Sequence, residues 1–377
     1  MQSFIRLMGV LFLLSSVSAP LFASTAASGV VEGAASEVVS GVTVAAATAA
    51  GGQERPVPLH SLHDLVAFEG VKGFGIDTYG GLGGKFVVVD NLNASGKGSL
   101  RWALEQSGKR VVVLIGPYEH HSNILPWRES GAEIRVIPEQ MGGGLDMAAL
   151  EAALTEADTA DLVVGSFSAA SNVTGLLTDV DAVTRRLKAH GALAIWDYAG
   201  GAPYLPMNMS PGSDCQKDAI VFSPHKFPGG PGSSGIAVIR DSVVRRDTPT
   251  APGGGTVSFV SPWRHSYSSK VEAREEGGTP NVVGDIRAAL VMLIKDAVGT
   301  QHILDTDAAL WARAHARLSR HPNIRLLGQF DHVEALPIFS FQVVDTAGAP
   351  VHQQLFTRML SDVFGVQVRG GCACAGP

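Results

Sequence analysis

Short apolar runs alternate with segments of helical period from residue 111 onward. Between the runs, Asp146 to Ala157 and Thr178 to Ala189 carry apolar residues at helical spacing. Alternation of strands and helices predicts a mostly parallel sheet with helices on both faces, an α/β fold. The runs that have the length and continuous apolar character of buried strands are Val111 to Ile115, Ile134 to Ile137, Leu162 to Phe167, Leu193 to Trp196, Ala219 to Phe222 and Gly235 to Ile239.

The helical segments carry their own start and stop signals. Thr178, followed three residues later by Asp181, resembles a capping box and predicts a helix that begins at Thr178 and ends before Gly191. A smaller α+β portion is expected toward the C-terminus. The later elements predicted are helices near Val282 to Val298 and Asp305 to Ser319, a strand at Ile338 to Val344 and a helix at Val351 to Phe364.

The N-terminal residues have the pattern of a secretory signal over 1–24. Arg6 precedes an apolar run from Leu7 to Val17, and small residues follow. The run is too short for an ordinary membrane span, so no membrane partner is expected. A buried or disordered apolar N-terminus is the alternative interpretation. Residues 25–67 are predicted to form a low-complexity linker.

Residues 68–113 mix glycine turns with a predicted strand at Phe86 to Val89 and a short amphipathic helix at Ser99 to Gln106. This segment resembles the N-terminal cap of secreted pectate lyases. It contains neither the calcium-binding acids nor the catalytic arginine of those enzymes. The resemblance therefore implies ancestry or a fusion, and no activity.

Composition indicates a chain with a sizeable apolar core and no charge-driven partner. The 377 residues are 45% hydrophobic and 17% charged, with a formal net charge of −6 and a sequence pI near 6.0. Nucleic acids and anionic membranes attract basic surfaces, so neither is expected to bind. The three cysteines do not form an even, spread set and predict no disulfide framework. The C-x-C pair at Cys372 and Cys374 has no second ligand pair, and no metal site is expected.

The strongest candidate for chemistry lies between Trp196 and Gly235. One buried run ends on Asp197, and a second delivers Ser223, His225 and Lys226 into a loop rich in glycine and proline. The carboxyl ends of parallel strands meet at one rim of a sheet, which brings a carboxylate and an amine together. A pyridinium cofactor needs an anion at its ring nitrogen and a lysine for its aldehyde. Taken alone, Asp197 also fits a turn cap and Lys226 a solvated loop residue.

This arrangement resembles the class V aminotransferase and cysteine desulfurase branch of the fold-type-I pyridoxal 5'-phosphate (PLP) enzymes. The resemblance implies an α/β large domain that binds PLP over 114–300, a small C-terminal domain over 301–377, and a homodimer. Besides Asp197 and His225-Lys226, the segments that carry it are Glu119 to Asn123 with Pro126-Trp127, Ser171 to Gly175, Glu276 to Asn281 and Arg369 to Cys374.

The resemblance also assigns site residues. Lys226 would hold PLP as a Schiff base, and Asp197 would keep the pyridine nitrogen protonated. His120 would stack on the ring and transfer protons, and Asn172 would lie near the phenolic oxygen and the substrate. The remaining cofactor contacts implied are Ser223 and His225 on the phosphate side and Thr279 in a loop that reaches the phosphate of a partner subunit.

The substrate implied is a small amino acid. Arg369 would bind its carboxylate as a bidentate pair, and Cys374, five residues later, stands where desulfurases take sulfur as a persulfide. A desulfurase or selenocysteine-lyase route is therefore favoured over transamination. Gly200 stands where desulfurases usually place a glutamine that bonds the phenolic oxygen, so Asn172 is expected to replace it in part.

Two other functions remain open at this point. The polypeptide before the His120 segment differs from the family's, which there supplies a helix, dimer contacts and a phosphate-binding turn. A truncated fusion that keeps the fold without catalysis is one alternative, and an exported pectate-lyase-like protein is the other. The signal-like segment points to an extracytoplasmic location, whereas the family resemblance points to the cytoplasm.

Overall fold

A computed structural model of the chain describes residues 110–374. The signal segment, the linker and the predicted elements at 86–89 and 99–106 lie outside the described residues and stay predictions. Among the described residues, no helix is long and apolar enough to cross a membrane.

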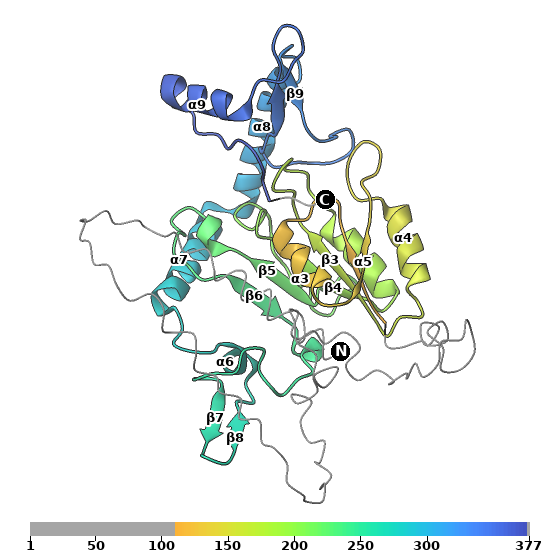
Figure 1. Cartoon of the computed structure of the whole chain (residues 1–377), viewed down its shortest axis with the longest axis vertical. Coiled ribbons are helices and arrows are strands. Elements are labelled where there is room, and N and C mark those ends of the chain that lie inside the picture. Colours follow the sequence, from red (N-terminus) through yellow and green to blue (C-terminus); the bar gives the residue numbers. More distant parts are fainter. Residues whose placement is uncertain (1–109, 375–377) are drawn as a thin grey trace, which may run out of the picture. The chain divides into compact units, whose positions relative to one another are not determined.

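The predicted strands form one six-stranded sheet with the order β2-β1-β3-β4-β5-β6 (Figure 1). All neighbours are parallel except the last pair, in which β6 runs antiparallel to β5. This confirms the mostly parallel sheet expected from the alternation of strands and helices. The strands are β1 Val111–Ile115, β2 Glu133–Val136, β3 Leu162–Ser168, β4 Leu193–Asp197, β5 Ala219–Phe222 and β6 Ile236–Ile239.

Alternate residues of each strand enter two separate apolar clusters on the two faces of the sheet. On one face, β1 contributes Val112 and Leu114 to a cluster with α4 (Met147–Glu156) and α5 (Val180–Ala189). On the other face, Val113 and Ile115 pack with Ile124 and with Trp127 of the short helix α3 (Leu125–Arg128). The sheet is thus covered by helices on both faces, as the sequence predicted.

Helix α5 does not begin as the capping-box pattern suggested. Its N-cap is Asp179, whose carboxylate accepts a hydrogen bond from the Ala182 backbone N–H at 3.0 Å. Thr178 instead donates its hydroxyl to the carbonyl oxygen of Ser168 at 2.8 Å. Because the Thr178 hydroxyl is turned toward Ser168, the carboxylate of the next residue, Asp179, serves as the N-cap.

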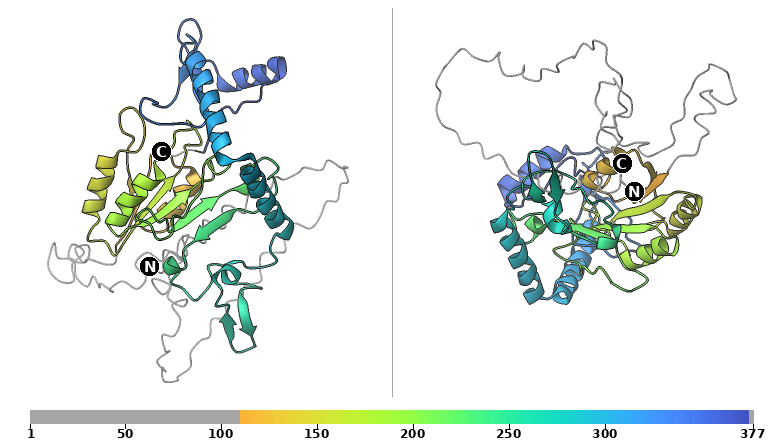
Figure 2. Two further views of the ribbon diagram at one scale, coloured as in Figure 1. Left: turned by 180° about the vertical axis from the view of Figure 1, so that it is seen from behind. Right: turned by 90° about the horizontal axis from the view of Figure 1, so that it is seen from below.

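The C-terminal half continues with long helices that meet at a sharp corner (Figures 1 and 2). Helix α7 keeps its predicted bounds, but α8 begins at Thr300, five residues before the predicted start. Gly299, with φ 90°, separates the two helices, because this left-handed conformation suits glycine. The strand predicted at Ile338 to Val344 is shorter, at β10. The remaining elements are β7 Val257–Val260, β8 His265–Tyr267, α6 Val271–Glu275, α7 Val282–Val298, α8 Thr300–Leu318, β9 Ile324–Leu326, β10 Phe341–Val343 and α9 Gln353–Phe364.

Candidate functional site

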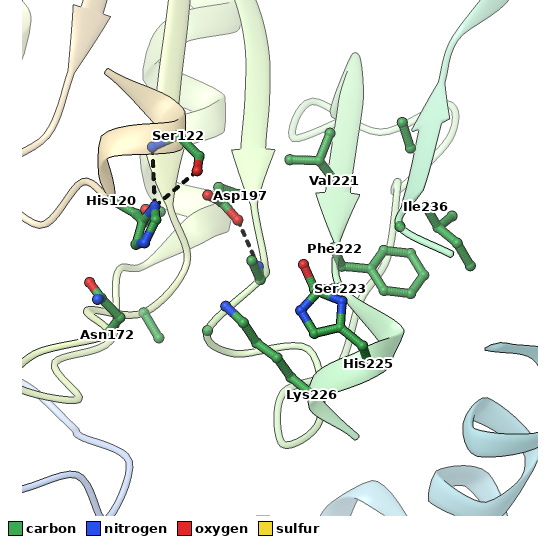
Figure 3. A pocket seen from close by; sticks show the side chains of 16 residues that line it. His120, Ser122, Asn172, Asp197, Val221, Phe222, Ser223, His225, Lys226 and Ile236 are labelled. Atoms are coloured by element: carbon green, nitrogen blue, oxygen red, sulfur yellow. Dashed lines mark hydrogen bonds between the residues drawn. The ribbon is translucent and has the colours of Figure 1, made fainter. Parts of the chain in front are cut away.

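A cavity of about 210 Å³ opens at the carboxyl ends of β3, β4 and β5, which is the rim that the sequence predicted (Figure 3). Side chains from separate segments converge on it. The predicted residues that line the cavity are His120, Asn172, Asp197, Ser223, His225 and Lys226.

Asp197 is the last residue of β4 and its side chain is buried. One carboxylate oxygen accepts a hydrogen bond from the Ala199 backbone N–H at 2.7 Å. Burial raises the pKa of Asp197, while that hydrogen bond and the charges of Lys226 and His120 act in the opposite direction. The strand end therefore presents a buried acid that a cationic group in the cavity would stabilise in its ionised form.

Lys226 reaches the cavity from a single 3₁₀ turn, Pro224–Lys226, that directly follows β5. The protein atoms around the amine lower the pKa of Lys226, and the charge of Asp197 raises it. The side chain is nonetheless exposed at the mouth of the cavity, where water weakens both effects. A less basic amine is a better nucleophile toward an aldehyde near neutral pH.

The loop after Lys226 requires glycine at one position. A Cβ atom on Gly230 would lie 2.0 Å from the carbonyl oxygen of Pro224, so the backbone passes too close for any side chain. The Gly230 N–H donates to the Phe227 carbonyl oxygen at 2.9 Å. This tight turn fixes the short helical turn that carries Lys226.

His120 is held in one tautomer by its own turn. Its Nδ1 accepts a hydrogen bond from the Ser122 backbone N–H at 3.1 Å, and the Ser122 hydroxyl lies equally close (Figure 3). A backbone N–H only donates, so the proton of the neutral ring resides on Nε2. Burial lowers the pKa of His120, which favours this neutral ring.

Asn172 presents an acceptor to the cavity. Its Nδ2 donates to the Ala373 carbonyl oxygen at 2.8 Å, which fixes the orientation of the amide. Its Oδ1 is buried and has no hydrogen-bond partner in the described part of the chain. In this orientation the Oδ1 atom of the amide can accept a hydrogen bond from an O–H or N–H group of a ligand.

The C-terminal loop lies against the same turn. The Cys374 carbonyl oxygen accepts a hydrogen bond from the His121 backbone N–H at 2.9 Å. Arg369 donates to the Cys372 carbonyl oxygen at 2.9 Å, and its guanidinium lies 3.9 Å from the Cys374 sulfur. Arg369 and Cys374 thus flank the cavity without lining it. Thr279, by contrast, is exposed and lies outside the cavity lining.

Sequence reasoning missed three polar residues at this site. Ser122 and Ser168 line the cavity, and Glu119 is buried directly behind them. Ser168 pairs in register with Asp197, so extending the predicted β3 by one residue places it at the rim. The sequence did contain one indication that Glu119 belongs to the site, because this acid directly precedes the predicted cavity residue His120.

The groups around the cavity fit a pyridoxal-type cofactor. A buried carboxylate, a lysine, a neutral imidazole and the unpartnered Asn172 oxygen all face one space. They are the types of group that a pyridine ring, an aldehyde and an exocyclic hydroxyl need.

Comparisons with known proteins agree with this fit. The family described as Aminotransferase class-V matches residues 98–377. A probable cysteine desulfurase of Streptomyces coelicolor is 30% identical over 269 residues, covering 70% of this chain and 61% of that protein. A cysteine desulfurase of Salmonella agona is 30% identical over 280 residues, covering 73% of this chain and 65% of that protein. The chain therefore spans less than two thirds of the length of these relatives.

Solved structures share the fold. The apo cysteine desulfurase of Thermococcus onnurineus superposes with a TM-score of 0.59 at 25% identity, over 71% of this chain and 64% of that one. An alanine–glyoxylate aminotransferase of Nostoc superposes with a TM-score of 0.53 at 17% identity, over 70% of this chain and 67% of that one. At that identity the second likeness concerns the fold alone. Both structures support the fold type I expected from the sequence.

The family match covers most of the chain and includes every residue that lines the cavity. Class V aminotransferases and cysteine desulfurases are PLP-dependent enzymes. On its sequence match, its fold and its strand-end cavity, this chain belongs to the aminotransferase class-V family.

Proposed function

We propose that the chain is a PLP-dependent enzyme that acts on a small amino acid, with a cysteine desulfurase or selenocysteine-lyase reaction favoured over transamination. The observation that carries the proposal is the convergence of Lys226 and Asp197 on one cavity at the carboxyl ends of the sheet. The relatives that match over most of the chain are named as cysteine desulfurases.

The residues around the cavity take distinct roles in this proposal. When bound, PLP supplies an aldehyde that links to amines and a ring that accepts electrons. Lys226 is the amine that holds the aldehyde, and Asp197 is the anion for the ring nitrogen. His120, with its proton on Nε2, covers the ring and delivers a proton from that atom. Asn172 accepts a hydrogen bond through its free Oδ1.

Ser223 and His225 complete the cofactor site on the phosphate side, in the turn that carries Lys226. Thr279 is proposed to act in a partner subunit, since it lies outside the cavity of its own chain. Arg369 binds the substrate carboxylate. Cys374 receives the sulfur, and the guanidinium of Arg369 beside its sulfur favours this role.

A homodimer accords with the surface of α7. This helix exposes a run of large apolar side chains that water does not favour. Sedimentation of the purified chain at about twice its 39.3 kDa mass supports the dimer, and a monomer mass at every concentration contradicts it. The exposed apolar residues of α7 are Val282, Val283, Ile286, Leu290, Met292, Leu293, Ile294 and Val298.

One observation favours a second candidate function. The chain spans 61% and 65% of the two curated relatives, so part of their length has no counterpart in the match. A scaffold that keeps the sheet and the cavity but binds PLP weakly is the alternative that accords with this. Cofactor binding separates the two candidates.

The deciding experiment adds PLP to the purified chain and records the visible absorption before and after borohydride. The enzyme predicts a band that borohydride fixes to the protein in the wild type and in the control Lys270→Ala, which changes an exposed lysine. Lys226→Ala is expected to lose the fixed cofactor. Absence of the band from the wild type contradicts the proposal and leaves the scaffold.

A second assay addresses the reaction. Cysteine is added to the loaded protein together with a thiol reductant, which reduces a protein persulfide and releases its outer sulfur as sulfide, and sulfide, alanine and the corresponding keto acid are measured. Desulfuration predicts sulfide and alanine in the wild type and in Cys372→Ala, and loss of sulfide in Cys374→Ala. Formation of keto acid without sulfide establishes transamination instead.

A further inference from the structure

Glu119 is a carboxyl group buried beneath the cavity, with 1% of its surface exposed. It directly precedes His120, but its side chain lies among the ends of β1 and β3. One oxygen accepts from the backbone N–H groups of Gly116 at 3.2 Å and Ser168 at 3.0 Å. The other accepts from Asn123 Nδ2 at 2.6 Å and from the Ser168 hydroxyl at 2.7 Å.

These partners lock the turn that carries His120 onto the sheet. Asn123, which donates to Glu119, also accepts a hydrogen bond from the Ser166 hydroxyl at 2.6 Å. Ser166 and Ser168 belong to β3, while Glu119 and Asn123 flank His120 in the chain. Movement of the histidine turn therefore breaks several buried hydrogen bonds at once.

Among residues 110–374, every hydrogen bond to Glu119 comes from an uncharged group, and no basic side chain forms an ion pair with it. Burial raises the pKa of Glu119 to about 7, against the hydrogen bonds from Asn123 and from the hydroxyl and backbone N–H of Ser168, which lower it, and the charge of Asp197 raises it further. Besides Asp197, the titratable groups that line the cavity are His120, His225 and Lys226. Glu119 is thus able to change charge near neutral pH.

The hydrogen-bond partners of Glu119 determine which of its two oxygens can carry a proton. The two backbone N–H groups on the first oxygen cannot accept a hydrogen bond, so a proton does not fit there. On the second oxygen, the Ser168 hydroxyl can turn from donor to acceptor. When Glu119 takes up a proton, its new O–H donates to Ser168 Oγ, and the serine hydrogen must point elsewhere. Ser168 lines the cavity, so that hydrogen turns toward it.

We propose that Glu119 and Ser168 form a buried proton switch that positions His120 and reports the charge of Glu119 to the cavity. With Glu119 ionised, the Ser168 hydroxyl points away from the cavity and leaves its oxygen as an acceptor there. With Glu119 protonated, the same hydroxyl presents a donor to the cavity, beside Asp197. Both residues are positioning residues. The use of the switch in catalysis rests on the proposed PLP function, but the switch itself exists without cofactor.

The first test uses the cofactor-free chain with ¹⁵N-labelled histidine and follows the His120 ring signals with pH by NMR. The wild type is expected to show the titration of the ring and a second inflection near pH 7, where Glu119 changes charge. Glu119→Gln is expected to lose the second inflection, and Ser168→Ala to lose at least about half of its amplitude, because the hydroxyl that transmits the change is gone. Glu139→Gln is the control: that carboxylate accepts from the hydroxyl of Tyr118, the residue before Glu119, but forms no hydrogen bond with Glu119, His120 or Ser168.

A second inflection that persists in Glu119→Gln, or its absence from the wild type, overturns the proposal. The amide N–H₂ of Gln can donate to Ser168 Oγ, but at that position it also meets the Nδ2 donor of Asn123, so Glu119→Gln is expected to be less stable than the wild type. Should Glu119→Gln not fold, the amplitude in Ser168→Ala decides the matter: an unchanged amplitude contradicts the switch.

The loaded protein gives an independent readout. The absorption of the bound cofactor is expected to change with pH around 7 in the wild type and in Glu139→Gln, and to lose that step in Glu119→Gln, with kcat lowered about 10-fold. If the chain binds no PLP, the proposed function fails, whereas the NMR titration still decides the switch. Equal pH profiles in wild type and Glu119→Gln reduce Glu119 to a structural residue.

Discussion

Replacing Glu119 by glutamine is expected to change how the stability of the chain depends on pH. Burial moves the pKa of this carboxyl from 4.5 to about 7. An acid whose pKa is raised by folding binds more protons in the native state than in the unfolded state between those two values. Stability therefore falls as pH rises through this window and levels off above about pH 7. Glutamine has no proton to lose and removes this dependence.

The magnitude follows from the size of the shift. Each pKa unit corresponds to about 1.4 kcal/mol, so the full shift of roughly 2.5 units is worth about 3 kcal/mol. Between about pH 5.5 and pH 8, the contribution of Glu119 to the unfolding free energy is expected to fall by about 2 kcal/mol. The difference in unfolding free energy between wild type and Glu119→Gln is expected to change by this amount, with the variant gaining relative to the wild type as pH rises.

Urea unfolding of both proteins and of Glu139→Gln, followed by circular dichroism at several pH values, measures this difference. The control is expected to run parallel to the wild type. Parallel curves for wild type and Glu119→Gln refute the reasoning, because they mean that Glu119 keeps one charge state across the window.

Three further substitutions test the site and the core. Asp197→Asn is expected to lower kcat about 100-fold or more while borohydride still fixes the cofactor to Lys226, because the anion for the ring nitrogen is lost and the amine is kept; equal kcat contradicts the role. Gly230→Ala places a Cβ 2.0 Å from the Pro224 carbonyl oxygen and is expected to lower the midpoint of thermal unfolding and the yield of fixed cofactor together; an unchanged yield means that the turn does not hold Lys226. Leu114→Ala removes a fully buried side chain from β1, which has a neighbour on each side in the sheet, and is expected to cost about 3 to 4 kcal/mol in urea unfolding, whereas a loss below about 1 kcal/mol means that the core collapses around the gap.

The apolar pattern of the sequence predicted most of the sheet because the burial and the length of a strand are both apparent from a few consecutive residues. β1 and β5 have the bounds that their apolar runs gave, and α7 also keeps its predicted ends. Short pieces such as β7, β8 and α6 were not predicted, since a few residues of mixed polarity carry no period. The start of α5 was predicted one residue too early for its cap, because two neighbouring residues both suit an N-cap and only the fold decides between them.

The site was predictable where its residues follow buried strands, as Asp197 and Lys226 do. The hydrogen bonds that tune it were not. Glu119 and Ser168 are 49 residues apart, and they meet because β1 and β3 are neighbours in the sheet, a fact of strand order that the apolar pattern does not contain. The same holds for Asn172, whose amide orientation depends on a carbonyl group 201 residues away. The role of Thr279 and the structure of the N-terminal segments stay predictions.

The hydrogen bond between Asn172 and the Ala373 carbonyl oxygen has a consequence for the order in which the molecule folds. Synthesis proceeds from the N-terminus, and domains begin to fold as they emerge. The sheet and the walls of the cavity can therefore form while the segment that carries Ala373 and Cys374 is still within the ribosome. The hydrogen bonds of those two residues to Asn172 and His121 close only afterwards, late and across a long stretch of chain. Until residues 373 and 374 have been added, the Asn172 amide and the His121 N–H lack these two partners, so the site takes the form described here only once the polypeptide has been synthesised through residue 374.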